Sequence, residues 1–167
     1  MEKLRFLLAA FVIAAVSISC HDRTDKENIS AVIDDMAVRV EKKDAAGLVA
    51  HLTEDYQDGD GRDRFRTQAM AEEYFSRYRG IKIKLLSSRI TMGAEQTATA
   101  EIDVSFFSGV AAALRKAVGF SGENYRVSCA FFKEGDWRIR EASWTYIPLN
   151  SLFPESLEIL RDIFPDL

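Results

Sequence analysis

Residues 137–144 read WRIREASW, and their apolar spacing decides how the second half of the chain folds. Trp137 and Ile139 alternate with arginines, which is the period-two pattern of a strand that buries one face. The apolar set then resumes at Ala142, one position later than strict alternation allows. Because an extra residue in a strand shifts the pattern in this way, the stretch predicts a strand with a β-bulge near residues 140–141.

The same alternation runs through three earlier segments. Every second residue is apolar in 81–85, in 98–106 and in 125–131. Residues 93–96 and 134–136 contain glycine with polar neighbours and predict tight turns between strands. These segments and the strand at 137–144 together predict an antiparallel sheet of about four strands.

Helical periodicity precedes the sheet. Apolar residues spaced three and four apart predict helices over about 29–40, 44–52 and 67–78, the last closed by a left-handed cap at Gly80. The Asp- and Gly-rich residues 53–63 between the second and third helices predict a loop. Three N-terminal helices packed in an antiparallel sheet make an α+β fold.

The remaining segments are less regular. Residues 109–122 fit either a connection or a short helix. A short C-terminal helix is predicted from Pro154 to Phe164, with Leu157, Leu160 and Ile163 on one side.

The first twenty residues have the pattern of an export signal. Lys3 and Arg5 precede the unbroken apolar run 6–16, which is about half as long as a membrane-spanning helix requires. Ser17-Ile-Ser-Cys20 follows and resembles a bacterial lipobox, which implies lipidation of Cys20, although Ser17 stands where that pattern has an aliphatic residue. Cleavage after Ser17, which would release a soluble exported protein, is the alternative.

These patterns divide the chain into a signal peptide 1–19, a tether 20–28, a folded domain 29–147 and a C-terminal extension 148–167. The expected location is the cell envelope on the periplasmic side. His21 stands where inner-membrane lipoproteins often carry aspartate, which favours the outer membrane.

Composition excludes some classes of partner. The net charge is −4 and the sequence contains no lysine or arginine cluster, so nucleic acid is not an expected partner. The two cysteines do not form a disulfide framework, and no cofactor or metal is expected. Residues 58–63 fail the calcium-loop template because Arg62 and Asp63 occupy its fifth and sixth positions.

The order of these elements resembles the NTF2-like superfamily, including its SnoaL-like and cystatin-like members, over about residues 29–146. The resemblance is carried by the leading helix, the segment LTEDY at 52–56, the alternating strand around Ala100 and the closing WRIREASW. It implies a strongly curved sheet that wraps the helices into an open cone. Members of the superfamily include isomerases, dehydratases and hydrolases as well as proteins that only bind ligands or dimerise, so fold alone does not fix function.

Candidate catalytic residues are few. His51 is the one histidine of the predicted domain, and with Asp55 and Tyr56 it forms the best acid–base set that the sequence offers. Aromatic residues expected to line the mouth of the cone, where a small apolar ligand would bind, are Tyr56, Tyr74, Tyr78, Trp144 and Tyr146.

Charged residues lie on the strand phase opposite to the apolar sets. They predict a ladder of acids and arginines on the outer face of the sheet, which would suit a homodimer contact. The predicted ladder residues are Glu101, Asp103, Arg126, Arg138 and Arg140. The sequence therefore favours a lipid-anchored, non-catalytic module for ligand binding or assembly. A SnoaL-like small-molecule isomerase or hydrolase is the alternative.

Overall fold

Helix α2 (Asp25–Lys42) begins the part of the chain that the computed structural model describes, residues 23–78, 80–108 and 123–148. Thr24 caps it in a capping box. The Thr24 hydroxyl accepts from the Glu27 N–H at 3.3 Å, and the Glu27 carboxylate accepts from the Thr24 N–H at 2.7 Å. The helix starts inside the segment predicted as a tether, so only four residues separate Cys20 from the first helical residue.

The predicted order of three helices followed by a four-stranded antiparallel sheet is wrong. One N-terminal helical region, α2 and the short α3 (Ala45–Val49), is followed by strand β1 (Leu52–Asp58), and α4 (Arg64–Arg77) comes only after that strand. The sheet has five strands and is mixed, because β1 pairs parallel with the last strand.

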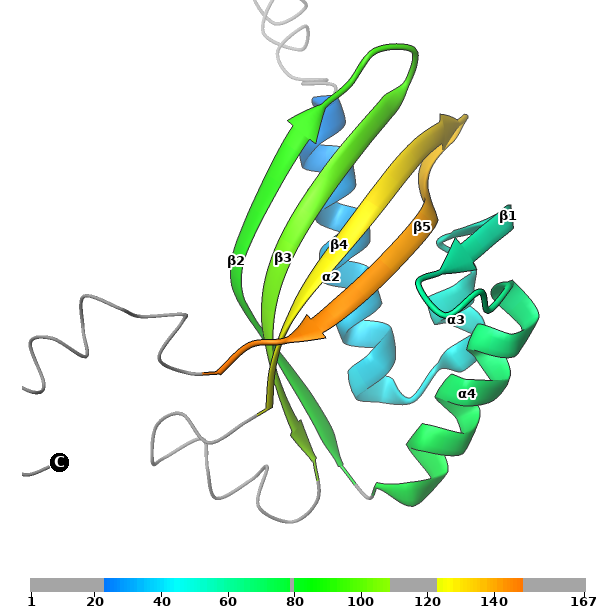
Figure 1. Ribbon diagram of the computed structural model, residues 1–167, viewed down its shortest axis with the longest axis vertical. Coiled ribbons are helices and arrows are strands. Elements are labelled where there is room, and N and C mark those ends of the chain that lie inside the picture. The colour runs from blue at the N-terminus through cyan, green and yellow to red at the C-terminus, as the bar shows by residue number, and fades with distance from the viewer. Residues whose placement is uncertain (1–22, 79, 109–122, 149–167) are drawn as a thin grey trace, which may run out of the picture.

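Strands β2 (Ile81–Met92), β3 (Thr97–Ser108), β4 (Glu123–Glu134) and β5 (Asp136–Tyr146) are the four that alternation predicts. They pair antiparallel in sequence order, and the full sheet runs β1-β5-β4-β3-β2. In Figure 1 they form a long twisted sheet with α2 across one face, while β1 lies beside β5 and close to α3 and α4.

The predicted bulge in β5 is confirmed. Phe131 faces Ile139 and Ala130 faces Glu141, so Arg140 is the extra residue. A second irregularity in β2, at Leu86 between the pairs Leu85–Val104 and Ser87–Asp103, was not foreseen.

Strand β1 replaces the first half of the predicted loop. Leu52 and Tyr56 are buried, but they are four residues apart, so the segment lacks the alternation that marks a strand. Its pairing with β5 is interrupted between Leu52 and Gln57, which explains the irregular spacing. Helix α4 ends with Tyr78 in an extended conformation, so the predicted cap at Gly80 is also wrong.

A continuous apolar core fills the space between α2 and the inner sheet face. It joins residues from α2, α3 and all five strands of the sheet, among them Ile29, Val49, Tyr56, Ile102, Phe131 and Trp137. A second cluster, of Ala45, Ala71, Phe75 and Ile81, joins α3 and α4 to the start of β2. The predicted helices at 109–122 and 154–164 lie outside the described residues.

Candidate functional site

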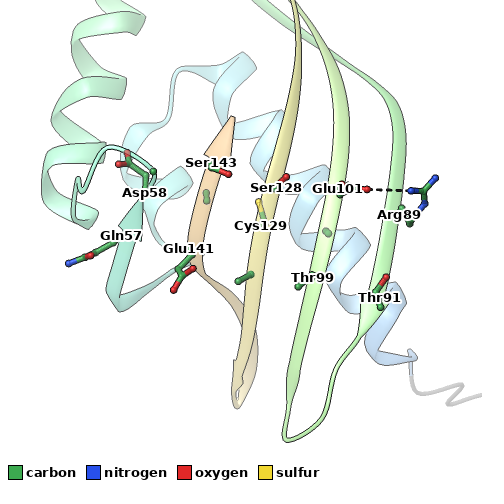
Figure 2. A pocket seen from close by; sticks show the side chains of 14 residues that line it. Gln57, Asp58, Arg89, Thr91, Thr99, Glu101, Ser128, Cys129, Glu141 and Ser143 are labelled. Atoms are coloured by element: carbon green, nitrogen blue, oxygen red, sulfur yellow. Dashed lines mark hydrogen bonds and ion pairs between the residues drawn. The ribbon is translucent and has the colours of Figure 1, made fainter. Parts of the chain in front are cut away.

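A recess, here called the sheet-face recess, lies on the outer face of the sheet. Figure 2 shows its side chains on the near side of the strands, with α2 behind them. Its volume is about 570 Å³. Small polar residues and charged residues line it, namely Gln57, Asp58, Gly59, Arg89, Thr91, Thr99, Ala100, Glu101, Ser128, Cys129, Ala130, Glu141, Ala142 and Ser143.

One strong ion pair lies next to the recess. Arg126 Nε donates to Asp103 Oδ1 at 2.8 Å, and its Nη2 donates to Asp103 Oδ2 at 3.0 Å. The Ser87 hydroxyl donates to the same carboxylate at 3.0 Å. The hydrogen bonds from Arg126 hold the pKa of Asp103 below its ordinary value. These two hydrogen bonds hold the Arg126 guanidinium in one orientation against Asp103.

The charges inside the recess are held more loosely. Arg89 Nη1 lies 3.3 Å from Glu101 Oε2, and the Arg89 side chain is 82% exposed. Glu141 is exposed at the other side of the recess and pairs with no cation among the residues that the structure describes. The recess therefore presents an available cation on β2 and an available anion on β5.

A loop anchored by Asp58 bounds the recess on the β1 side. The Asp58 side chain is fully buried, and it accepts hydrogen bonds from the N–H groups of Asp60 and Arg62 at 2.9 Å and from Arg62 Nε at 2.7 Å. Burial raises the pKa of Asp58, but the hydrogen bonds from Arg62 outweigh it and keep the pKa below its ordinary value. Gly59 donates its N–H to Ala142 O at 2.9 Å.

Glycine at position 59 suits this close approach. A Cβ at that position would lie 3.3 Å from the Cβ of Ser143. Arg62 extends from the same loop over the ring of Trp144, with 5.2 Å between its Cζ and the ring centroid. The loop is thus fastened to β5 at two places.

The two other predicted ladder residues, Arg138 and Arg140, lie outside the sheet-face recess. Arg140 stacks 4.0 Å above the Phe132 ring, and its Nε lies 3.2 Å from Asp55 Oδ2. Arg138 lines a second recess of about 410 Å³, between α2, the end of α3 and the β4–β5 hairpin. The five predicted ladder residues thus form one strong pair and three separate contacts rather than a continuous row.

His51 also lines this second recess. Its Nε2 lies 2.7 Å from Asp35 Oδ2, and Asp35 accepts from Arg39 Nε at 3.1 Å. The hydrogen bonds from His51 and then Arg39 lower the pKa of Asp35. No local pattern pairs His51 with Asp35, because they are sixteen positions apart and the turn after α2 and the whole of α3 lie between them.

The three candidate catalytic residues do not converge. Asp55 is exposed on β1 beside Arg140, whereas Tyr56 is 3% exposed inside the core. Burial raises the pKa of Tyr56 to about 12, and burial likewise raises the pKa of the nearby Cys129 thiol to about 12. Both groups therefore stay neutral at pH 7 and act as core residues.

The predicted pocket aromatics do not surround one cavity. Tyr56 belongs to the core, and none of the five lines either recess. Tyr74 and Tyr78 stack with centroids 4.7 Å apart and contact Phe106. Trp144 and Tyr146 are exposed on β5.

Neither a metal site nor a membrane span is found within residues 23–78, 80–108 and 123–148. No group of three or more His, Cys, Asp or Glu side chains there could hold a metal ion. No helix in those ranges is long and apolar enough to cross a bilayer. Cys20 lies outside them.

Comparison with known proteins identifies the architecture. A protein from Caulobacter vibrioides with a cystatin-like fold superposes with a TM-score of 0.62 at 13% identity, over 80% of this chain and 97% of that one. The fold is that of the NTF2-like, cystatin-like proteins. No protein-family model and no curated protein matches the sequence.

Two further solved structures superpose on the described chain. A Novosphingobium aromaticivorans protein, provisionally named a scytalone dehydratase, has a TM-score of 0.62 at 14% identity over 74% of this chain and 84% of that one. Bd1075 from Bdellovibrio bacteriovorus has a TM-score of 0.60 at 13% identity over 74% of this chain. The match spans 41% of Bd1075, less than half of its length. At such identities the likeness extends to the fold alone.

Proposed function

We propose that this chain is an exported protein, anchored to a membrane through lipid on Cys20, whose NTF2-like domain is a non-catalytic assembly module. The lipobox-like Ser17-Ile-Ser-Cys20 after an eleven-residue apolar run supports the anchor. The periplasmic face of the outer membrane is the proposed location.

The packed interior of the domain supports the proposal that it is not an enzyme. An enzyme of this fold needs a substrate-sized cavity with an ionisable group directed into it. Here the side chains of Tyr56, Phe131 and Trp137 occupy the space between α2 and the sheet, and all three are less than 5% exposed. The same packing disfavours a small apolar ligand inside the cone. A partner is therefore more readily accommodated on the outer face of the sheet.

We propose a second copy of this chain as the partner on the sheet-face recess. In a face-to-face pair with a two-fold axis parallel to the strands, β2 of each copy lies over β5 of the other. Arg89 on β2 is level with Ser143 of β5, and Glu141 lies two residues further along that strand. The long Arg89 side chain therefore reaches along the strand to Glu141 of the second copy, and the contact forms twice. The recess offers these two charges without a strong intramolecular partner, and complementary charges favour a defined register.

A charge exchange tests this pairing. In the mature chain with Cys20→Ser, we expect Arg89→Glu and Glu141→Arg each to weaken dimerisation about tenfold, because each places like charges together. The double variant Arg89→Glu/Glu141→Arg restores opposite charges and should recover most of the lost affinity. Sedimentation equilibrium gives the dimer dissociation constants.

Arg66→Glu is the matched control. It makes the same charge reversal in the first turn of α4, away from the sheet face, where a helix N-terminus tolerates an acid. It should leave dimerisation unchanged. A mature chain that stays monomeric at high concentration, or a double variant as weak as the single ones, would reject the proposed pair.

The second candidate function is a small-molecule hydrolase or isomerase that uses His51. Its support is the 2.7 Å contact with Asp35 on the wall of a recess of about 410 Å³. A carboxylate that orients imidazole is a frequent feature of general bases. Asp55 and Tyr56 do not contribute to this version of the site, because neither lines the recess.

A further inference from the structure

The second recess, here called the hairpin recess, lies at the end of the domain where α2 begins. Its walls come from α2, the end of α3 and the β4–β5 hairpin, and its volume is about 410 Å³. Asp25, the first residue of α2, accepts hydrogen bonds from Lys133 Nζ at 2.7 Å and from Trp137 Nε1 at 2.9 Å. Figure 1 shows the start of α2 and both hairpin turns at the same end of the sheet. The hairpin recess therefore lies at the N-terminal end of the folded domain.

Four charged or titratable side chains line the hairpin recess. Two of them, His51 and Lys133, are each held by a carboxylate of α2 at 2.7 Å. The other two, Asp136 and Arg138, make no hydrogen bond or ion pair with any residue that the structure describes. They lie two residues apart on β5, which is about 7 Å along a strand. The recess thus presents one anion and one cation that the described chain leaves without a partner.

The backbone of β5 offers a further donor at the same place. Ile139 donates its N–H to His51 O at 2.9 Å, where β5 starts to pair with β1. Successive N–H groups of a strand point to opposite sides, so the N–H of Trp137 points to the same side as that of Ile139. The paired part of β1 begins at Leu52, opposite Ile139, and does not extend to Trp137. The Trp137 N–H is therefore directed to the side of the recess, where β1 supplies no acceptor.

The proposed anchor would hold this recess close to a bilayer. Only four residues separate Cys20 from Asp25, and a fully extended chain covers at most about 18 Å over that span. The headgroups of the bilayer are therefore within reach of the recess when Cys20 is acylated. Each phospholipid headgroup carries a phosphodiester anion. In phosphatidylethanolamine a primary ammonium lies a short ethylene link away from it.

We propose that the hairpin recess binds the headgroup of a zwitterionic phospholipid with a primary ammonium, as in phosphatidylethanolamine. The phosphate accepts hydrogen bonds from the Arg138 guanidinium and the Trp137 N–H, and the ammonium donates to the Asp136 carboxylate. One cation and one anion complement a zwitterion, whereas a purely anionic headgroup would be repelled by Asp136. The site rests on the proposed anchor for its position at the membrane. A bound headgroup holds the N-terminal end of the domain against the bilayer surface.

A titration of the mature chain with Cys20→Ser tests the site without the anchor. The probes are soluble: glycerophosphoethanolamine, glycerophosphocholine and inorganic phosphate. NMR chemical shifts of Trp137 and its neighbours report binding in the recess and give the dissociation constants. We expect glycerophosphoethanolamine to bind about tenfold more tightly than the other two, because it alone combines a phosphodiester with an ammonium that donates hydrogen bonds.

Two substitutions separate the two ends of the headgroup. Arg138→Gln should weaken the binding of all three probes about tenfold, because it removes the guanidinium that holds the phosphate. Asp136→Asn should weaken only glycerophosphoethanolamine, so that its advantage over glycerophosphocholine is lost. The matched control is Arg140→Gln, the same change two residues further along β5, since Arg140 stacks on Phe132 outside the recess. It should leave all three dissociation constants unchanged.

Cosedimentation of the same chain with phosphatidylcholine vesicles tests the lipid itself. The bound fraction should rise when phosphatidylethanolamine is included and should fall again with Arg138→Gln. Inorganic phosphate bound as tightly as glycerophosphoethanolamine would assign the recess to a free anion and overturn the proposal. Equal binding of the choline and ethanolamine probes, or no shift at Trp137 with any probe, would also overturn it. Because Cys20 is replaced throughout, these results are independent of whether the native protein is acylated.

Discussion

Phe131→Ala is expected to lower the free energy of unfolding by about 4 kcal/mol, the cost of a large cavity in a packed interior. Phe131 is 2% exposed and lies in the cluster that joins α2, β1 and the sheet. If the domain held an open ligand cavity beside this ring, much of the lost contact would already be absent and the cost would be far smaller. The measurement therefore distinguishes a filled cone from a hollow one.

The neighbouring Phe132 is the control. It lies on the other sheet face under Arg140 and is half-buried, so Phe132→Ala should cost about 1 kcal/mol. Urea unfolding of the mature chain, followed by circular dichroism, gives both values. Equal costs for the two variants would contradict the filled interior.

Asp58→Asn is expected to lower the free energy of unfolding by about 3 kcal/mol, because it leaves Arg62 without its buried carboxylate partner. The folded-state pKa of Asp58 is depressed below its ordinary value of 3.8. The stabilisation by this group is therefore fully present above that value and is lost as pH falls through the lower, folded-state pKa. The variant should lack this part of the acid-induced loss of stability.

Asp60→Asn provides the comparison, since Asp60 pairs with the same arginine at 2.6 Å but its side chain is 68% exposed. It should cost less than about 1 kcal/mol and keep the acid dependence. Denaturant titrations at a series of pH values between neutral and acidic conditions measure both effects. An equal loss of unfolding free energy in the two variants would show that burial of Asp58 does not strengthen its pairing with Arg62.

Strict alternation made four strands predictable, and even the bulge at Arg140 followed from the shifted position of Ala142. The apolar spacing over 29–40 also predicted helix α2, although the helix begins four residues earlier, at Asp25, after the capping box of Thr24 and Glu27. These features are local, since each depends on residues within one turn or one pleat.

Strand β1 was not predictable, because it is held by tertiary contacts. Its residues Glu54 to Asp58 are rich in acids, and only Leu52 and Tyr56 mark its buried side. The parallel partner β5 lies about eighty residues later, and no local pattern encodes that pairing. The contact between His51 and Asp35 and the role of Asp58 as the anchor of a loop were not predicted either, because both depend on the folded arrangement of side chains.

Membrane attachment through Cys20 is the claim on which the proposed role depends, and intact-mass spectrometry of the protein purified from cell envelopes tests it most directly. We expect a chain that begins at Cys20 and is heavier than residues 20–167 by several acyl groups, and we expect the Cys20→Ser variant to be released from the membrane fraction. Stable attachment requires more than one acyl chain. An unmodified chain that begins at Ile18 after cleavage behind Ser17, or one that keeps residues 1–19, would contradict the account.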